Sequence, residues 1–271
     1  MLPKLLQQVE QKIEQKGEAS TENMDIRISN KNIGLLEKQS EQELSGFSEQ
    51  KQTTRIDRSG NGVSVTYLRQ LQIFDPEDYL NRKVSIIGLG TIGSWTALAL
   101  AKLGIKNLSI YDFDLVDKHN IPNQFYKVTD IGTPEAFSLM NSIKEFSDID
   151  SSSNNKYEAQ LIEDILIIGV DSMQERKRIH SELEKKEQKP IIIIDGRIGG
   201  SQLEIYTCQS LEEWGKTFID QPSNDPCGAR AIVGIGMVMG GFISNQVVKY
   251  LTNKHFPKNI IFDLNGYKIL T

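Results

Sequence analysis

The stretch VSIIGLGTIG, residues 84–93, decides the fold of this chain. Its apolar start is too short for a helix and is typical of a buried strand. Three glycines follow, Gly88, Gly90 and Gly93, and apolar residues then recur at helical spacing as far as Leu103. The stretch therefore predicts a strand, a tight glycine turn and a helix.

Outward from this stretch, strands and helices alternate along the chain. A second strand is predicted at 107–111, which completes a strand–helix–strand unit. Further patterns predict strands at 165–170, 191–195 and 203–207, a helix at about 230–251, and a closing hairpin over 262–270 that turns at Asn265-Gly266. Such alternation is typical of an α/β fold with a sheet covered on both faces.

The N-terminal part of the chain differs in composition from the rest. Residues 1–62 are rich in Gln, Glu, Lys and Ser and contain a single aromatic residue, Phe47. Such a segment buries too little apolar surface to offset its ordering entropy. We therefore predict a flexible, polar N-terminal extension over 1–62 and a folded domain over 63–271, with the boundary at the turn-forming stretch SGNG, residues 59–62.

Composition excludes several classes of protein. A formal net charge of −5 does not favour binding to nucleic acid or to anionic membranes. The apolar segment 231–248 is long enough to be mistaken for a membrane span, but Asn245 and Gln246 near its end favour a buried core helix. Cys208 and Cys227 have neither disulfide nor zinc-site spacing. Together with an N-terminus unlike a secretory signal, this predicts a cytoplasmic protein that binds neither nucleic acid nor membrane.

The glycine turn predicts a nucleotide site. A sharp turn that lets a phosphate approach the backbone requires glycine, and the following helix directs unpaired N–H groups and a positive dipole end towards the phosphates. Asp112 ends the second strand, where a carboxylate can accept hydrogen bonds from both ribose hydroxyls. These features indicate an adenine nucleotide, and by themselves they fit both NAD and ATP.

The next residues favour ATP. The run YDFDLVDKHNIPNQF (111–125) places Asp114, Asn120 and Gln124 after Asp112. It resembles the D-x-D-x-V-x-x-x-N-L-x-R-Q block of the ThiF/MoeB/HesA superfamily, which includes the ubiquitin-activating enzymes. The resemblance implies a Rossmann-like doubly wound mixed sheet, ATP and Mg²⁺ as cofactors, and adenylation of the C-terminal carboxylate of a ubiquitin-like protein or peptide.

Two further blocks agree with this superfamily. The pair R-Q at 69–70 resembles an element whose arginine reaches the phosphates across a dimer interface, which implies a catalytic Arg69 and a homodimer. The stretch GVDSMQER (169–176) resembles a D-N-x-x-x-R block, with Ser172 where asparagine is usual. That likeness implies that Asp171 binds magnesium and takes part in catalysis, and that Arg176 supports the site.

Two residues depart from the family pattern. Asn123 stands where the motif has arginine, and Glu135 stands where it has a phosphate-binding lysine. Losing one such donor costs roughly 2.7–4 kcal/mol of transition-state stabilisation. An active enzyme then needs substitute cations, for which Lys118, Lys127 and Arg197 are candidates. The departures also keep open a catalytically degenerate nucleotide-binding subunit of a larger complex, whereas an NAD-linked oxidoreductase is disfavoured by the pair of carboxylates at 112 and 114.

The two cysteines receive different interpretations. Cys227 resembles the position before the late helix where some family members form a thioester with the activated acyl group, and a helix N-terminus would raise its thiolate fraction. The alternative is a small residue that fills the entry to that helix. Cys208 ends a predicted strand and is assigned to the core.

Overall fold

The computed structural model describes residues 55–56, 62–63, 65–147, 149–154, 156–158, 160, 164–199, 202–218 and 232–271. The chain divides after Val65 into two units, of which residues 66–271 form the larger. The first unit contains a short antiparallel pair, β1 (Arg55–Ile56) and β2 (Gly62–Val63).

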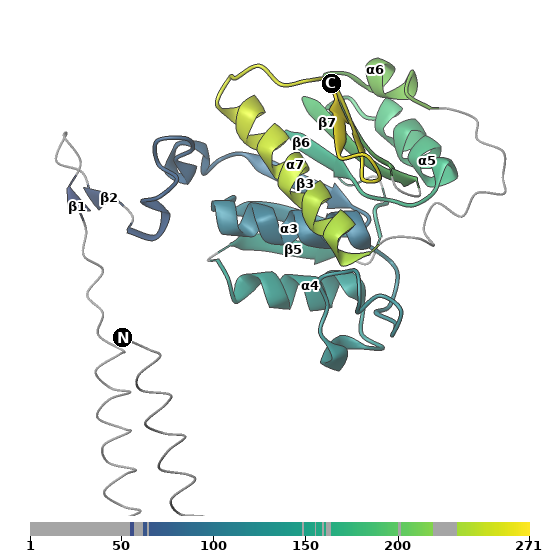
Figure 1. Cartoon of the computed structure of the whole chain (residues 1–271), viewed down its shortest axis with the longest axis horizontal. Coiled ribbons are helices and arrows are strands. Elements are labelled where there is room, and N and C mark those ends of the chain that lie inside the picture. The colour runs from purple at the N-terminus through teal and green to yellow at the C-terminus, as the bar shows by residue number, and fades with distance from the viewer. Residues whose placement is uncertain are drawn as a thin grey trace, which may run out of the picture. The chain divides into compact units, whose positions relative to one another are not determined.

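The larger unit is built on one eight-stranded sheet (Figure 1). Its strand order is β10-β9-β8-β7-β6-β3-β4-β5. The strands are β3 (Lys83–Ile87), β4 (Asn107–Tyr111), β5 (Asp150–Asn154), β6 (Ile165–Ile168), β7 (Ile192–Gly199), β8 (Gln202–Cys208), β9 (Asn259–Asp263) and β10 (Lys268–Leu270). From β5 to β7 neighbouring strands are parallel, and from β7 to β10 they are antiparallel. The mixed sheet expected from the family resemblance is confirmed.

Helices cover both faces of the sheet. They are α3 (Thr91–Leu103), α4 (Glu135–Lys144), α5 (Met173–Glu184), α6 (Leu211–Gly215) and α7 (Val233–Leu251), with short 3-10 turns at Val65–Tyr67, Pro76–Tyr79 and Val128–Asp130. Alternate residues of a strand point to opposite faces, so Ile86 packs in the core beneath α3, α4 and α7 and Ile87 in the core beneath α5 and α6.

The position of β3 creates a crevice. β3 lies between β4 and β6, and the chain leaves it on one side for β4 and later returns on the other side as β6. In open α/β sheets, the carboxyl ends of strands at such a switch point are where ligands bind. We therefore expect a ligand site at the loops that follow β3, β4 and β6.

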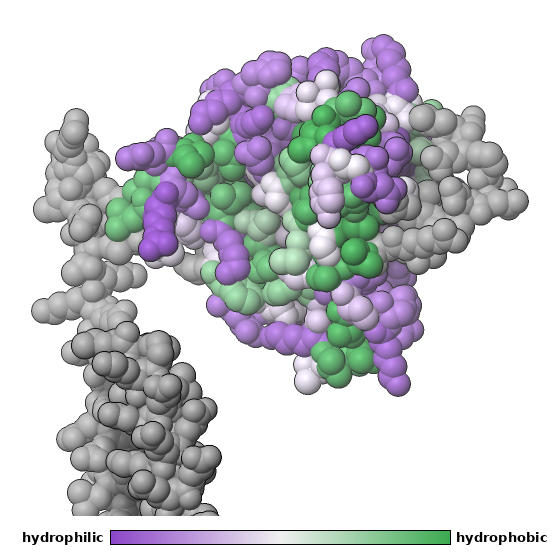
Figure 2. All heavy atoms as spheres, in the orientation of Figure 1, coloured by the Kyte–Doolittle hydropathy of each residue, from purple (hydrophilic) through white to green (hydrophobic). Residues whose placement is uncertain are grey.

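Helix α7 is the apolar segment that resembles a membrane span in length. Its inner side is buried: Ile235, Met239, Ile243 and Val247 belong to the same hydrophobic core as the buried residues of α3. Met237 on its outer side is exposed, and Figure 2 shows hydrophobic side chains along this helix. Of the helices in the described part of the chain, none combines the length and hydropathy that crossing a bilayer requires.

Candidate active site

A cavity of about 490 Å³ lies at the carboxyl ends of the parallel strands. Its walls come from the glycine turn after β3, the loop after β4, the start of α4, the segments that follow β5 and β6, the start of α5, the end of β7, and β8. Gly88, Gly90, Asp112, Asp114 and Asp171 all line it. The structure thus brings together residues that are up to 83 positions apart, from Gly88 to Asp171, around one space.

The three glycines of the turn have different reasons to be glycine. Gly88 has a φ of +89°, and a Cβ there would lie 2.5 Å from the backbone nitrogen of Val170. A Cβ on Gly93 would lie 1.9 Å from the carbonyl oxygen of Gly88. Gly90 meets no such obstacle, since the nearest described atom to its Cβ position is Nε2 of Gln124 at 3.6 Å. Its missing side chain leaves free space on the cavity wall.

The N-terminus of α3 opens onto this space. Gly90 is the N-cap residue and provides no side-chain hydrogen bond to the first turn. Thr91 and Ile92, the first two helical residues, line the cavity. Because the first N–H groups of a helix have no intrahelical partners and carry its positive dipole end, this wall favours an anion.

Asp112 holds the turn against β4. One carboxylate oxygen accepts the Leu89 N–H at 2.7 Å, and the other accepts the Asp114 N–H at 2.9 Å. Burial raises the pKa of Asp112, which these hydrogen bonds partly offset. A carboxylate can accept about four hydrogen bonds, so Asp112 retains capacity for the hydroxyls of a ligand.

Asp114 and Asp171 approach each other from two loops. The pKa of Asp114 is raised, first by burial and second by the negative charge of Asp171. Nowhere in the described part of the chain are three or more His, Cys, Asp or Glu residues arranged to hold a metal ion. Mg²⁺ commonly binds one or two carboxylates and completes its shell with substrate phosphates and water, so this pair fits magnesium that arrives with a phosphate ligand.

The amide side chains of the loop after β4 face the same cavity. Asn120 is buried, and its Oδ1 accepts the Asp117 N–H at 2.6 Å, which shapes the loop. The main-chain carbonyl oxygen of Asn123 accepts the Trp95 indole N–H at 3.0 Å. Oε1 of Gln124 is buried and has no hydrogen-bond partner among the described residues. A ligand donor in the cavity could satisfy this acceptor.

Glu135 is the most unusual residue of the wall. It is 3% exposed, and its Oε2 lies 3.2 Å from the hydroxyl of Tyr126. Burial, followed by the charges of Asp112 and Asp114, raises its pKa to about 8. The position that resembles the family's phosphate-binding lysine is therefore occupied by a buried carboxyl group.

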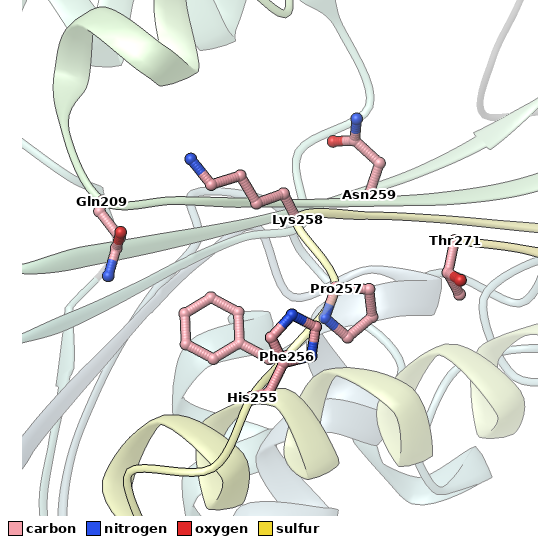
Figure 3. A pocket seen from close by; sticks show the side chains of 7 residues that line it. All are labelled: Gln209, His255, Phe256, Pro257, Lys258, Asn259 and Thr271. Carbon is pink, nitrogen blue, oxygen red and sulfur yellow. The ribbon is translucent and has the colours of Figure 1, made fainter.

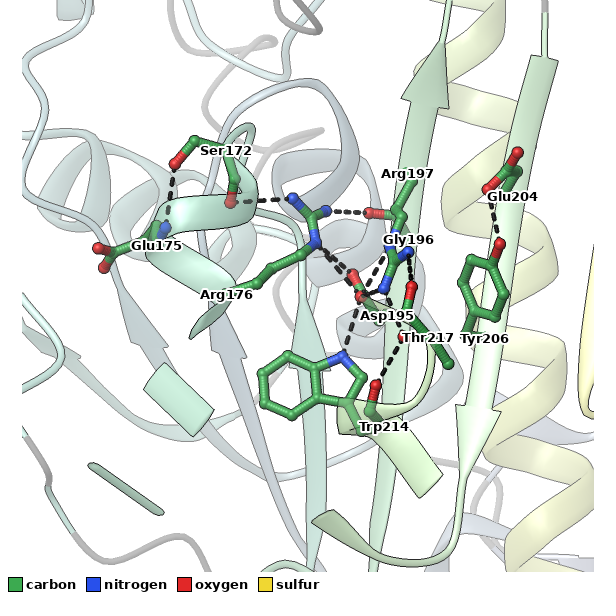
Figure 4. A network of polar contacts seen from close by, with 10 residues as sticks. All are labelled: Ser172, Glu175, Arg176, Asp195, Gly196, Arg197, Glu204, Tyr206, Trp214 and Thr217. Atoms are coloured by element: carbon green, nitrogen blue, oxygen red, sulfur yellow. Dashed lines mark hydrogen bonds and ion pairs between the residues drawn. The ribbon is translucent and has the colours of Figure 1, made fainter. Parts of the chain in front are cut away.

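The two arginines that line the cavity, Arg176 and Arg197, both bind a buried carboxylate (Figure 4). Asp195 is fully buried and accepts hydrogen bonds from Nε of Arg176 at 3.0 Å, Nη2 of Arg197 at 2.7 Å and Nε1 of Trp214 at 2.9 Å. Arg197 also donates to the carbonyl oxygen of Thr217 at 2.8 Å. Arg197 lines the cavity as expected for a substitute cation, but its guanidinium is tied to Asp195.

The other predicted residues that the structure describes lie outside the cavity. Arg69 is exposed and does not line the cavity of its own chain. Lys118 and Lys127 are also outside its walls, and Lys127 pairs with Glu145 at 2.8 Å. Cys227 lies outside the described residues. Cys208 is buried, and burial raises the pKa of its thiol to about 12.

Lys156 and Tyr157 are among the residues that line the cavity without having been predicted from the sequence. Lys156 and Tyr157 follow β5, which lies beside β4 at the edge of the sheet. The sequence of β5, DSSSN, has no apolar pattern that would predict a strand. The sequence therefore gives no reason to expect the residues after β5 near Asp112. Tyr126 does not line the cavity, but its hydroxyl lies beside the lining residue Glu135, and the sequence gives no sign of this contact.

A second hollow, of about 630 Å³, is a shallow surface feature near the C-terminus (Figure 3). Its residues are Gln209, His255, Phe256, Pro257, Lys258, Asn259 and Thr271. Lys258 pairs with Glu213 at 2.8 Å. The hollow contains neither a glycine turn nor a carboxylate side chain, so the cavity at the switch point is the better candidate for chemistry.

Comparison with known proteins agrees with this geometry. The sequence matches the ThiF family over residues 67–270. The probable adenylyltransferase/sulfurtransferase MoeZ of Mycobacterium tuberculosis is 41% identical over 64 residues, which are 23% of this chain and 16% of MoeZ. The NEDD8-activating enzyme E1 catalytic subunit of Arabidopsis thaliana is 28% identical over 117 residues, 39% of this chain and 25% of the subunit. These matches therefore cover a quarter or less of either relative.

Solved structures share the fold. E. coli MccB, crystallised with AMPCPP and MccA, superposes with a TM-score of 0.62 at 18% identity, covering 79% of this chain and 72% of that chain. MccB crystallised with ATP superposes with a TM-score of 0.58 at 16% identity, covering 72% and 64% of the two chains. At these identities the likeness establishes the Rossmann-like architecture and leaves the chemistry to the site itself.

Proposed function

Because this chain belongs to the ThiF family, we propose that it is an ATP-dependent adenylyltransferase that activates the C-terminal carboxylate of a ubiquitin-like protein or a peptide. One observation carries the proposal. The turn at Gly90, the N-terminus of α3 with its first N–H groups, and the carboxylates at 112, 114 and 171 all line one cavity. A nucleoside triphosphate with its magnesium ion matches that combination of groups.

Each wall of the cavity has a role in this proposal. The turn around Gly90 and the first N–H groups of α3 bind phosphate oxygens. Asp112 binds the ribose hydroxyls, and Asp114, Asn120, Asn123 and Gln124 shape the phosphate pocket. Asp171 binds Mg²⁺, which when present would neutralise phosphate charge.

The reaction follows from the placement of these groups. An oxygen of the acceptor carboxylate attacks the α-phosphorus, the bond to pyrophosphate breaks, and an acyl adenylate and pyrophosphate are formed. The N-terminus of α3 lowers the barrier by stabilising charge on the phosphates, and the cavity holds the two reactants in line. In this proposal Arg69 comes from the second subunit of a homodimer and adds positive charge.

Pyrophosphate exchange tests this function. Folded protein is incubated with ATP, labelled pyrophosphate and a broad set of peptides with free C-terminal carboxylates, and label in ATP is measured. We expect exchange with some peptides, and at least a hundredfold loss in Asp171→Asn, because that change removes the proposed magnesium ligand. Asp78→Asn, at an exposed carboxylate outside the cavity walls, is the matched control and should keep full activity. Absence of exchange with every peptide would remove the catalytic proposal.

A second candidate is a nucleotide-binding subunit without its own activity. Two observations favour it: Arg176 and Arg197 both bind Asp195, and position 135 has a carboxyl group where the family pattern has a lysine. The variant Glu135→Lys separates the two candidates. If exchange is measured only in Glu135→Lys, the native chain is the inactive kind, and if the native chain exchanges on its own, this second candidate is rejected.

A further inference from the structure

The wall of the proposed nucleotide site is rich in carboxyl groups. Among the residues that the structure describes, six acidic side chains line the cavity: Asp112, Asp114, Glu135, Asp171, Glu175 and Glu204. A nucleoside triphosphate is itself an anion, and its magnesium complex still carries a net negative charge. Like charges repel each other more strongly in a partly desolvated space than in water. We therefore expect the site to need a positive side chain that can turn towards the phosphates.

Most basic side chains of the wall already face a carboxylate. In the described part of the chain, the basic residues that line the cavity are His119, Lys156, Arg176 and Arg197. Both arginines bind Asp195 (Figure 4). Nδ1 of His119 lies 3.6 Å from a carboxylate oxygen of Asp117. Lys156 forms no ion pair with any residue that the structure describes. Its ammonium group is therefore available to a ligand.

Strand pairing places Lys156 beside the proposed ribose ligand. β5 runs parallel to β4, and Asn154 at its end lies opposite Tyr111 at the end of β4. Asp112 follows Tyr111 directly, and Lys156 comes two residues after Asn154. Since neighbouring strands lie about 4.8 Å apart, Lys156 leaves the sheet at the same edge as Asp112. Both residues line the same cavity.

The next residue, Tyr157, anchors this segment. Its side chain is 1% exposed, and its ring meets that of Tyr111 edge-on, with 5.6 Å between the ring centroids. Its carbonyl oxygen accepts a hydrogen bond from Nη2 of Arg178 at 3.1 Å, and its hydroxyl donates to the carbonyl oxygen of Gln160 at 3.2 Å. Lys156 itself is exposed. Because the adjacent backbone is held by these contacts, a ligand would have to order only the lysine side chain.

We propose that Lys156 binds the phosphates of the nucleotide and supplies the positive charge that Asn123 and Glu135 do not. This inference rests on the proposed function and adds to its site a residue from the edge of the sheet. A lysine suits this place, because its ammonium group is a compact charge on a flexible four-carbon stem. Its hydrogen bonds to phosphate oxygens would be charge-assisted, which makes them stronger than neutral ones.

Calorimetric titration with Mg·ATP tests the inference. Lys156→Met removes the charge and keeps an unbranched side chain. It should raise the dissociation constant about tenfold or more, which is the scale of a hydrogen bond to a charged group. Lys156→Arg keeps the charge and should bind Mg·ATP more tightly than Lys156→Met. Lys144→Met, at an exposed lysine that ends α4 outside the cavity walls, is the matched control and should bind like the native chain.

Two further measurements exclude a purely structural effect. Adenosine has no phosphates, so the native chain and Lys156→Met should bind it with equal affinity. Higher salt should reduce the difference between these two proteins for Mg·ATP, because dissolved ions screen the attraction between exposed charges. If Lys156→Met loses as much affinity for adenosine as for Mg·ATP, or if Lys156→Arg binds as weakly as Lys156→Met, the inference is overturned.

The same titrations separate this inference from the proposed function. If the native chain and Lys156→Met bind Mg·ATP equally well, the inference is wrong and the proposed function is unaffected. If the folded native chain does not bind Mg·ATP at all, the proposed function fails, and the role of Lys156 fails with it.

Discussion

At the scale of single residues, Gly93 is required by the packing of the fold, whereas we expect Gly90 to be required by the ligand. A Cβ at 93 would overlap the carbonyl oxygen of Gly88, whereas a Cβ at 90 would enter free space on the cavity wall. We therefore expect Gly93→Ala to destabilise the protein by about 3 kcal/mol or more, because backbone must shift. Gly90→Ala should cost up to about 1 kcal/mol and abolish Mg·ATP binding. Urea denaturation and calorimetry measure the two effects, and a Gly90→Ala variant that binds ATP normally would contradict this assignment.

Replacement of Asp195 should lower the stability of the fold by a measurable amount. It lies between Arg176 and Arg197 in the interior, so replacing it leaves two guanidinium groups without their shared carboxylate. Removing one partner of a buried ion pair typically costs about 3–5 kcal/mol, and we expect Asp195→Asn to lower the free energy of unfolding by that amount. The exposed pair Glu212 and Lys216 offers the control, since Glu212→Gln should leave the denaturation midpoint unchanged. Equal midpoints for both variants would rule out a structural role for this cluster.

Only some of these residues could be assigned a role from the sequence. The glycines and Asp112 could be predicted because a short motif places them between a strand and a helix. The role of Asp195 could not, since its partners come from α5, α6 and β7 and meet only in the folded chain. The acidity of Glu135 was visible in the sequence, but its burial and its contact with Tyr126 were not.

At the scale of elements, α3 and α7 pack closely through glycines of α7. A Cβ on Gly240 would lie 2.8 Å from the backbone carbon of Trp95, and one on Gly236 would lie 2.8 Å from the carbonyl oxygen of Thr91. The pair of small residues four positions apart, which resembles a membrane-helix motif, thus serves packing against α3. The neighbouring Gly241 is exposed and has nothing within 4 Å of its Cβ position.

These contacts give opposite expectations for adjacent positions. Gly240→Ala should destabilise the protein by about 1–3 kcal/mol, because the new methyl group meets backbone of α3. Gly241→Ala should stabilise it by about 0.5–1 kcal/mol, since alanine is the better helix former and meets no obstacle. Thermal unfolding of both variants measures the difference. If both changes shift stability in the same direction, the close packing of α3 and α7 is not the reason that position 240 requires glycine.

Elements with apolar runs were predicted well from the sequence. The predicted strand at 107–111 is β4, and the predicted helix at 230–251 is α7 with a later start, at Val233. By contrast, β5 is polar and lies at the edge of the sheet, where few apolar side chains are needed. β7 runs past Asp195 to Gly199 because it pairs with β8, and such pairing depends on a distant segment.

At the scale of the whole molecule, the buried Glu135 makes stability depend on pH. Its pKa is about 8 in the folded chain and near 4.5 when solvated, so the folded state holds a proton that the unfolded state has lost between these values. Stability gained from this group is present below about pH 4.5 and is lost as pH rises to about 8. Glu135→Gln removes this dependence.

The difference in unfolding free energy between the native chain and Glu135→Gln should therefore fall as pH rises from 5 to 8. The expected slope is up to about 1.4 kcal/mol per pH unit, and the difference should be constant above about pH 9. Urea denaturation of both proteins at each pH measures it. Parallel stability curves across this range would show that Glu135 titrates at the same pH folded and unfolded.

The central claim is that one cavity, opened by Gly90 and rimmed by three aspartates, receives ATP with magnesium. Calorimetric titration of the native chain with Mg·ATP and, separately, with NAD tests it most directly. The account predicts that Mg·ATP binds at one site per chain and more tightly than NAD. Tighter binding of NAD, or no binding of Mg·ATP by the folded chain, would contradict it.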